Sequence, residues 1–126
     1  MGQNFLTDRN ILDTIVNTTE IKNKTILEIG PGTGNLTSFI LKNNPKKIIV
    51  IEKDNDLAQN LNENFGDKLK IINDDILNVN EYSLCDEKVT VFGNLPYNIS
   101  TEILSKWILN LKEDFWFDYL VLMFQK

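Results

Sequence analysis

The chain has 126 residues, 42% of them hydrophobic and 25% charged, and a net charge of −5 at pH 7. These values predict one small soluble domain, and the acidic balance argues against a nucleic-acid-binding surface on this segment taken alone. The sequence has no histidine and a single cysteine, Cys85, which excludes an internal disulfide, an ordinary zinc site and a histidine general base. No apolar run is long enough to span a membrane and no leader opens the chain, so we expect a cytoplasmic protein with no membrane and no metal partner.

The pattern of apolar residues predicts alternating helices and strands. A first helix is expected after a cap at Thr7 or Asp8, with an apolar face at Ile11, Leu12, Ile15 and Val16. Strands are predicted at residues 25–27, 47–51, 69–72, 89–92 and 119–124, and helices follow residue 35, Asp56, and Ser100 or Thr101. This alternation favours an α/β fold with a parallel sheet, right-handed crossovers and the strand order 3-2-1-4-5.

Three glycines, Gly30, Gly32 and Gly34, occupy the bend between the first strand and its helix. Glycine permits φ > 0 and lets a ligand approach the backbone, and the following helix directs N–H groups into the bend, where an anionic or hydroxyl-rich ligand would be held. The spacing is G-x-G-x-G, whereas the dinucleotide fingerprint is G-x-G-x-x-G. With Glu28 two residues earlier, the bend resembles the nucleoside-binding loop of S-adenosylmethionine (SAM) methyltransferases; the alternative is a structural turn without a ligand.

The expected strand order reverses between the first and fourth strands, and ligands bind outside the carboxyl ends of strands at such a point. Glu52 ends the second strand, where a carboxylate accepts hydrogen bonds from ribose hydroxyls; the alternative is an ion pair with Lys53. Asp75 follows the third strand and can accept from the exocyclic amino group of the cofactor adenine. Its neighbour Asp74 can do the same, and either acid can instead cap a turn.

The sequence Asn94-Leu95-Pro96-Tyr97 is predicted to form a turn after the fourth strand, facing the glycine bend across one crevice. An adenine amino group is a poor nucleophile, and two acceptors favour the cationic form that develops during attack. The Asn94 side-chain oxygen and a main-chain carbonyl near Leu95 can serve as these acceptors. Pro96 would fix the turn and Tyr97 would stack on a flipped base; a purely structural turn is the alternative.

Taken together, these motifs, with Gly2-Gln3-Asn4-Phe5-Leu6 and Phe124-Gln125-Lys126, resemble the rRNA adenine N6-dimethyltransferase family. The amino-acid sequence of the bend is most similar to that of the branch of the family that acts on small-subunit (16S) rRNA. The resemblance implies a Rossmann-like class I SAM-dependent methyltransferase that dimethylates N6 of two adjacent adenosines in a hairpin near the rRNA 3′ end. It implies SAM contacts at Asn4, Leu6, Gly30, Glu52, Asp75 and Asn94, and target-adenine contacts at Asn94, Leu95, Pro96 and Tyr97, with Phe124 as a second stacking residue.

The resemblance also predicts the domain organisation. We expect residues 1–126 to be the N-terminal part of the catalytic domain, truncated before its last strands, with the helical C-terminal RNA-binding domain absent. The expected partner is the immature small ribosomal subunit, and the expected full-length state is a monomer. Two other hypotheses stay open: a non-catalytic ribosome-assembly or transcription-factor-like protein on the same fold, and an NAD-dependent oxidoreductase, which the glycine spacing opposes.

Overall fold

The computed structural model describes residues 9–17, 19–109 and 115–125. Helices, short 3-10 turns and strands alternate along the chain: α1 (Arg9–Val16), β1 (Thr25–Ile29), α2 (Asn35–Leu41), β2 (Lys47–Ile51), α3 (Asn55–Phe65), η2 (Gly66–Lys68), β3 (Lys70–Ile72), η3 (Ile76–Asn78), η4 (Glu81–Ser83), β4 (Val89–Pro96), α4 (Tyr97–Leu109) and β5 (Phe117–Gln125). The predicted cap residues Thr7 and Asp8 lie outside the described residues. No helix in the described ranges combines the length and the apolar character needed to cross a bilayer.

The five strands form one parallel sheet in the order β3-β2-β1-β4-β5, which confirms the predicted topology. At the carboxyl end of β1, Ile29 is in register with Ile51 on one side and with Gly93 on the other. The segments that leave β1, β2 and β4 therefore start at the same edge of the sheet, which is where ligands bind in open α/β sheets.

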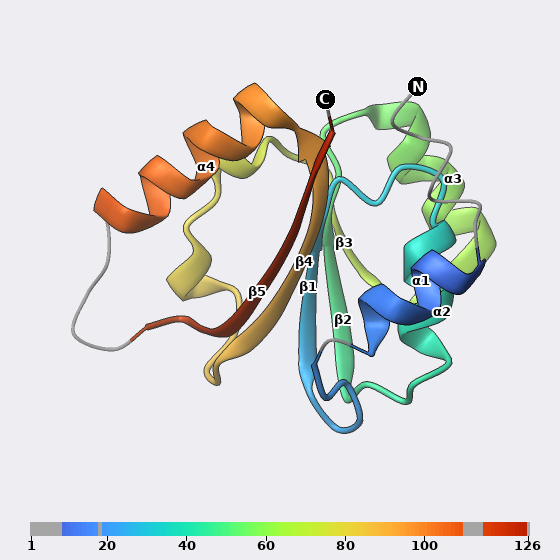
Figure 1. Cartoon of the computed structure of the whole chain (residues 1–126). Coiled ribbons are helices and arrows are strands. Elements are labelled where there is room, and N and C mark those ends of the chain that lie inside the picture. The colour runs from blue at the N-terminus through green and yellow to red at the C-terminus, as the bar shows by residue number, and fades with distance from the viewer. Residues whose placement is uncertain (1–8, 18, 110–114, 126) are drawn as a thin grey trace.

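Helices α1, α2 and α3 cover one face of the sheet, and α4 covers the other together with the segment that carries η3 and η4 (Figure 1). Every residue of β1 is buried, as expected for a parallel strand covered on both faces. Alternation along the strand sends Ile26 into the core beneath α1 and α2, and Leu27 into the core beneath α4.

Helix α3 begins one residue earlier than predicted. The Asp54 carboxylate accepts hydrogen bonds from the main-chain N–H groups of Asp56 (2.9 Å) and Leu57 (3.1 Å). Asp54 is therefore the N-cap, and Asp56 lies within the first turn. Gly66 is the C-cap of the helix and has φ of 57°, a left-handed value that glycine adopts readily.

The junction between β4 and α4 differs from the prediction. Residues 94–96 continue β4 instead of forming a turn, because β5 pairs with β4 as far as Pro96, which lies opposite Gln125. Helix α4 begins directly at Tyr97, so Ser100 and Thr101 lie inside the helix and do not cap it. The same pairing makes β5 longer than the predicted 119–124.

We expect Asp54→Ala to lower the free energy of unfolding by about 1 kcal/mol, because two main-chain N–H groups lose their acceptor. Asp54→Asn retains an oxygen acceptor at the same place and is expected to stay within about 0.5 kcal/mol of the wild type. Urea unfolding followed by circular dichroism measures both values. Equal losses in the two variants would show that charge rather than capping makes the contribution.

Candidate cofactor and substrate site

The glycine bend lies against the carboxyl end of β4. Gly30 has φ of +65°, and a Cβ atom placed on it would lie 2.9 Å from Leu95 Cδ2 and 3.8 Å from the main-chain oxygen of Asn94. A side chain at this position would therefore fill the space between the two segments. The predicted proximity of the bend to the Asn94–Leu95 segment is present in the main chain.

The amide groups of the three glycines are all used within the protein. Gly30 N–H donates to Ile51 O (3.0 Å), Gly32 N–H to Glu52 Oε1 (3.2 Å) and Gly34 N–H to Pro31 O (3.0 Å). These three donors are therefore not directed at a ligand. The expectation that N–H groups of the following helix hold an anionic or hydroxyl-rich ligand stays a prediction. A pyrophosphate-binding bend depends on such free amides, and this bend does not offer them at its glycines.

A cavity of about 370 Å³ opens beside the bend, a size within the range of small-molecule sites. It brings together four of the predicted residues, Gly30, Glu52, Asp75 and Leu95. The other lining residues are Ile29, Ile51, Lys53, Asp74, Ile76, Leu77, Ile99 and Glu102. No residue of this second group was predicted to have a role in the site apart from Lys53 and Asp74. Only their positions in the fold could have indicated that they line the cavity, since Ile29 and Ile51 end strands and Ile99 and Glu102 are one turn apart on a helix.

The charges around this cavity favour a cationic ligand. Four carboxylates line it, from Glu52, Asp74, Asp75 and Glu102, against the single ammonium group of Lys53. Lys53 Nζ lies 3.6 Å from Asp75 Oδ2, so the predicted alternative pairing of Lys53 with Glu52 is not what forms. An acidic cavity with hydrogen-bond acceptors suits a positively charged molecule that carries hydroxyl and amino groups, and opposes a pyrophosphate.

Glu52 is held in a fixed orientation at the end of β2. Its side chain is buried, with Oε1 accepting from Gly32 N–H (3.2 Å) and Oε2 from Asp54 N–H (3.0 Å). Each carboxylate oxygen has capacity for a second hydrogen bond, so a ligand hydroxyl can still be bound. The carboxylate also ties the glycine bend to the segment that precedes α3.

Asp75 and Asp74 both accept hydrogen bonds from the main chain. Asp75 Oδ1 accepts from Leu77 N–H (3.0 Å) at the start of η3, and Asp74 Oδ1 accepts from Asp75 N–H (2.7 Å). The capping role that the sequence left open for either acid is therefore present for Asp75. Asp75 still lines the cavity, and its second oxygen is the one near Lys53.

Asn94 has a buried side-chain oxygen, Oδ1, with no hydrogen-bond partner in the described part of the chain. A buried acceptor without a partner costs about 1–3 kcal/mol, so such an atom calls for a donor from outside. Alternation along β4 places the Asn94 side chain on the opposite face from Leu95, and Asn94 is not among the cavity-lining residues. The carboxamide therefore does not line this cavity, whereas the main-chain oxygen of Asn94 lies against Gly30 in the bend.

The remaining predicted residues are placed by the main chain only. Pro96 ends β4 and Tyr97 starts α4, and Phe124 on β5 is in register with Leu95. Asn4 and Leu6 lie outside the described residues. Among the residues that the structure describes, no group of three or more acidic or cysteine side chains is arranged to bind a metal ion.

Comparison with known proteins identifies the family. A model of the family described as Ribosomal RNA adenine dimethylase matches residues 1–126. The chain belongs to this family.

Curated relatives and solved structures agree with this assignment. The chain is 66% identical over 126 residues to the Ribosomal RNA small subunit methyltransferase A of Pelagibacter ubique (strain HTCC1062), matching all of this chain and 48% of that protein. It is 45% identical over 131 residues to the protein of the same name from Wolbachia sp. subsp. Drosophila simulans (strain wRi), covering 100% and 47%. The chain therefore spans about half the length of the curated relatives it matches.

Two crystal structures show the same fold. A dimethyladenosine transferase from Plasmodium falciparum superposes with a TM-score of 0.74 and 32% identity, covering 94% of this chain and 42% of that one. The 23S rRNA methyltransferase ErmE superposes with a TM-score of 0.69 and 28% identity, covering 80% and 41%. The parallel sheet of this adenine-dimethylase family member is thus a methyltransferase sheet, as the sequence predicted.

Glu28, the acid that precedes the bend in this family member, is fully buried, and its carboxyl group accepts a hydrogen bond from the Thr37 hydroxyl of α2. Burial raises the pKa of Glu28 from 4.5 to about 7; the Thr37 hydrogen bond opposes this rise, and the nearby Glu52 carboxylate adds to it. The residue therefore links β1 to the first turns of α2 as a largely uncharged group below neutral pH.

We expect the Glu28 carboxyl group to make the free energy of unfolding fall as the pH rises from about 4.5 to about 7. In that window the folded state holds the Glu28 proton and the unfolded state has lost it, so folding is favoured at the acid end by up to about 3 kcal/mol. Glu28→Gln keeps an acceptor for Thr37 and cannot ionise. The free energy of unfolding of the wild type minus that of Glu28→Gln should therefore decrease across the window, as urea titrations at several pH values would measure.

Glu20→Gln, at an exposed position, controls for the loss of one carboxylate. A wild-type-minus-Glu28→Gln difference that stays constant between pH 4.5 and pH 8 would contradict the assignment.

Proposed function

We propose that the whole protein transfers methyl groups from SAM to the N6 amino groups of two adjacent adenosines in a 3′-end hairpin of small-subunit (16S) rRNA, during ribosome biogenesis. Family membership over residues 1–126 and the names of the relatives support this assignment. The structural observation that carries it is the buried Asn94 Oδ1, an acceptor without a partner at the end of the strand next to the glycine bend.

The cofactor cavity suits SAM because it is acidic and SAM carries a sulfonium and an ammonium group. In this proposal Glu52 accepts hydrogen bonds from the ribose hydroxyls, and Asp75 accepts from the adenine amino group. Gly30 leaves room for the ligand between β1 and Leu95, since a Cβ atom there would contact Leu95. Asn4 and Leu6 are proposed to complete the site. SAM supplies a methyl carbon that the positive sulfur has already activated.

The protein's part in the reaction is alignment and stabilisation of charge. Asn94 Oδ1 and the main-chain carbonyl at Leu95 accept from the target amino group and stabilise the positive charge that develops on its nitrogen. The proton leaves to water after the transfer, so a sequence without histidine is sufficient. Tyr97 and Phe124 are proposed to stack on the target base, and Pro96 limits the main-chain freedom between Leu95 and Tyr97.

The partner in this proposal is the immature small ribosomal subunit, which also implies a cytoplasmic location. The net charge of −5 on this segment is unfavourable for binding rRNA. We therefore assign most RNA binding to a helical C-terminal domain in the other half of the whole protein. We expect the whole protein to act as a monomer.

Asn94→Ala in the whole protein is expected to slow methylation of immature small subunits by about 100-fold or more, because one acceptor for the developing positive charge is removed. Asn98→Ala, at an exposed position on α4, is the matched control and should keep the wild-type rate. Transfer of radiolabelled methyl groups measures both. A wild-type rate in Asn94→Ala would contradict the mechanism, and no methylation by the wild type would favour a non-catalytic binding protein.

Glu52→Ala is expected to weaken SAM binding by about 10-fold to 100-fold, since charge-assisted hydrogen bonds to the ribose are lost. Glu52→Gln keeps an acceptor and should bind with intermediate affinity. Titration calorimetry measures the dissociation constants, and circular dichroism checks that the fold is intact. Unchanged affinity in Glu52→Ala would disprove the ribose role.

A further inference from the structure

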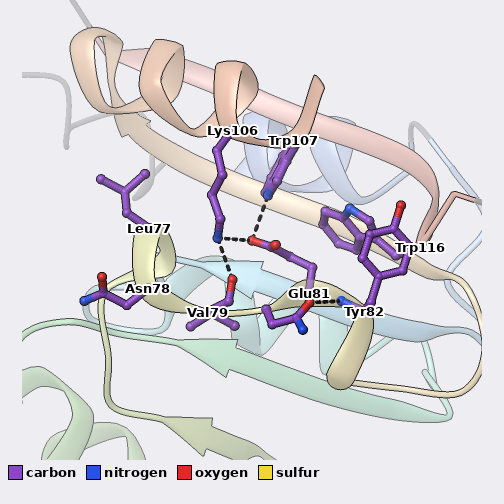
Figure 2. Close-up of a pocket in the computed structure, with 9 residues that line it drawn as sticks. Leu77, Asn78, Val79, Glu81, Tyr82, Lys106, Trp107 and Trp116 are labelled. Carbon is purple, nitrogen blue, oxygen red and sulfur yellow. Dashed lines mark hydrogen bonds and ion pairs between the residues drawn. The ribbon is translucent and has the colours of Figure 1, made fainter. Parts of the chain in front are cut away.

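A second polar cluster lies behind the η3 wall of the cofactor cavity and is centred on Lys106 of α4 (Figure 2). Lys106 Nζ donates hydrogen bonds to the main-chain oxygens of Ile76 (2.7 Å) and Val79 (2.5 Å), and to Glu81 Oε2 (2.8 Å). The side chain of Glu81 is only 7% exposed and that of Lys106 20%. This ammonium group therefore joins α4 to both ends of the η3 turn and to η4.

The carboxylate in this cluster is held by a second donor from α4. Trp107 Nε1–H donates to the same Glu81 oxygen at 2.8 Å, and its ring packs edge-on against Trp116 with the centroids 5.0 Å apart. Figure 2 shows Lys106 and Trp107 reaching down from the helix towards Glu81 side by side. Replacing such a buried ion pair by apolar groups often leaves stability unchanged, so the pair is weak evidence of a contribution to stability.

The η3 turn is fixed at both ends. Asp75 caps its start through Leu77 N–H, and Lys106 binds carbonyl groups at Ile76 and beyond its end at Val79. Ile76 and Leu77 form one wall of the cofactor cavity, while α4 contributes another through Ile99 and Glu102. The same helix that carries Lys106 thus forms the wall that faces η3.

We propose that Lys106 is a positioning residue for the cofactor: by binding the carbonyl groups of η3 it sets the separation between the η3 wall and the α4 wall, and keeps Asp75 aimed into the cavity. This inference rests on the function proposed above, because the cavity is taken to hold SAM. Lys106 does not line that cavity, and it acts only through the η3 main chain.

The decisive variant is Glu81→Gln combined with Lys106→Met in the whole protein. It leaves no unpaired buried charge, keeps an acceptor for Trp107 Nε1–H and retains the length of the lysine stem. The dissociation constant and the KM for SAM are expected to rise about 3-fold to 10-fold, within the range of energetic coupling between neighbouring elements, while kcat at saturating SAM changes less than about twofold. A merely structural role would lower Tm and leave the KM unchanged.

Two further variants are controls. Lys46→Met with Glu87→Gln makes the same two changes at an exposed ion pair of 2.9 Å, in which the carboxylate also accepts from Thr25 Oγ1. It should leave the dissociation constant for SAM unaltered.

Glu81→Gln alone leaves Lys106 able to bind both carbonyl groups, and its dissociation constant for SAM is expected to stay within about twofold of the wild-type value. If SAM binding were weakened equally in this single variant and in the double variant, the role given to the contacts between Lys106 and the carbonyl groups would be overturned.

Amide hydrogen exchange on the wild type tests the inference without any substitution. The N–H groups of Asn78 and Val79 donate to Asp75 O (2.9 Å) and Ile76 O (3.2 Å), and Ile76 O also accepts from Lys106 Nζ. Saturating SAM should slow their exchange about threefold or more, because the ligand would contact the Ile76–Leu77 wall of the same turn that Lys106 binds. No slowing would overturn the inference.

The outcomes separate the two proposals. A wild type that does not bind SAM overturns the proposed function and this inference together. A wild type that binds SAM, with a double variant that binds equally well, overturns the inference alone.

Discussion

The site depends on the parallel pairing of β1 with β2 on one side and β4 on the other. Because Ile29 is in register with both Ile51 and Gly93, the chain leaves these three strands at one level. The glycine bend, Glu52 and the Asn94–Leu95 segment come together for this reason, and the hydrogen bond from Gly32 N–H to Glu52 reinforces the arrangement. A buried parallel sheet is rigid, so residues that follow its strand ends are held without a dedicated scaffold.

Hydrogen bonding inside the bend decides which kind of ligand the sheet edge can accept. Many nucleotide-binding loops present amides to a phosphate, but here the three glycine amides donate to Ile51, Glu52 and Pro31. Two of these bonds join the bend to the end of β2, and one of them has the buried Glu52 carboxylate as its acceptor. An edge whose loop is joined to a carboxylate in this way is electrostatically suited to a cation.

The sequence was sufficient for the topology and for part of the cavity, because periodicity, glycine spacing and acids at strand ends are local signals. It predicted Gly30, Glu52, Asp75 and Leu95, which line one cavity. The prediction of a turn at residues 94–96 was wrong. A proline favours a turn when only its neighbours in sequence are considered, whereas the pairing of β4 with β5 is a long-range effect. Lys106 gave no signal either, because its acceptors are main-chain oxygens some 30 residues earlier in the chain, which no side-chain pattern reveals.

The packing of Trp107 against Trp116 has a practical result. These are the two tryptophans in the 126 residues, and both belong to the hydrophobic core on the α4 side of the sheet. Indole emission from this segment is therefore an optical probe of one face only. It will report when α4 or the start of β5 rearranges, and it will be blind to events confined to the layer of α1, α2 and α3.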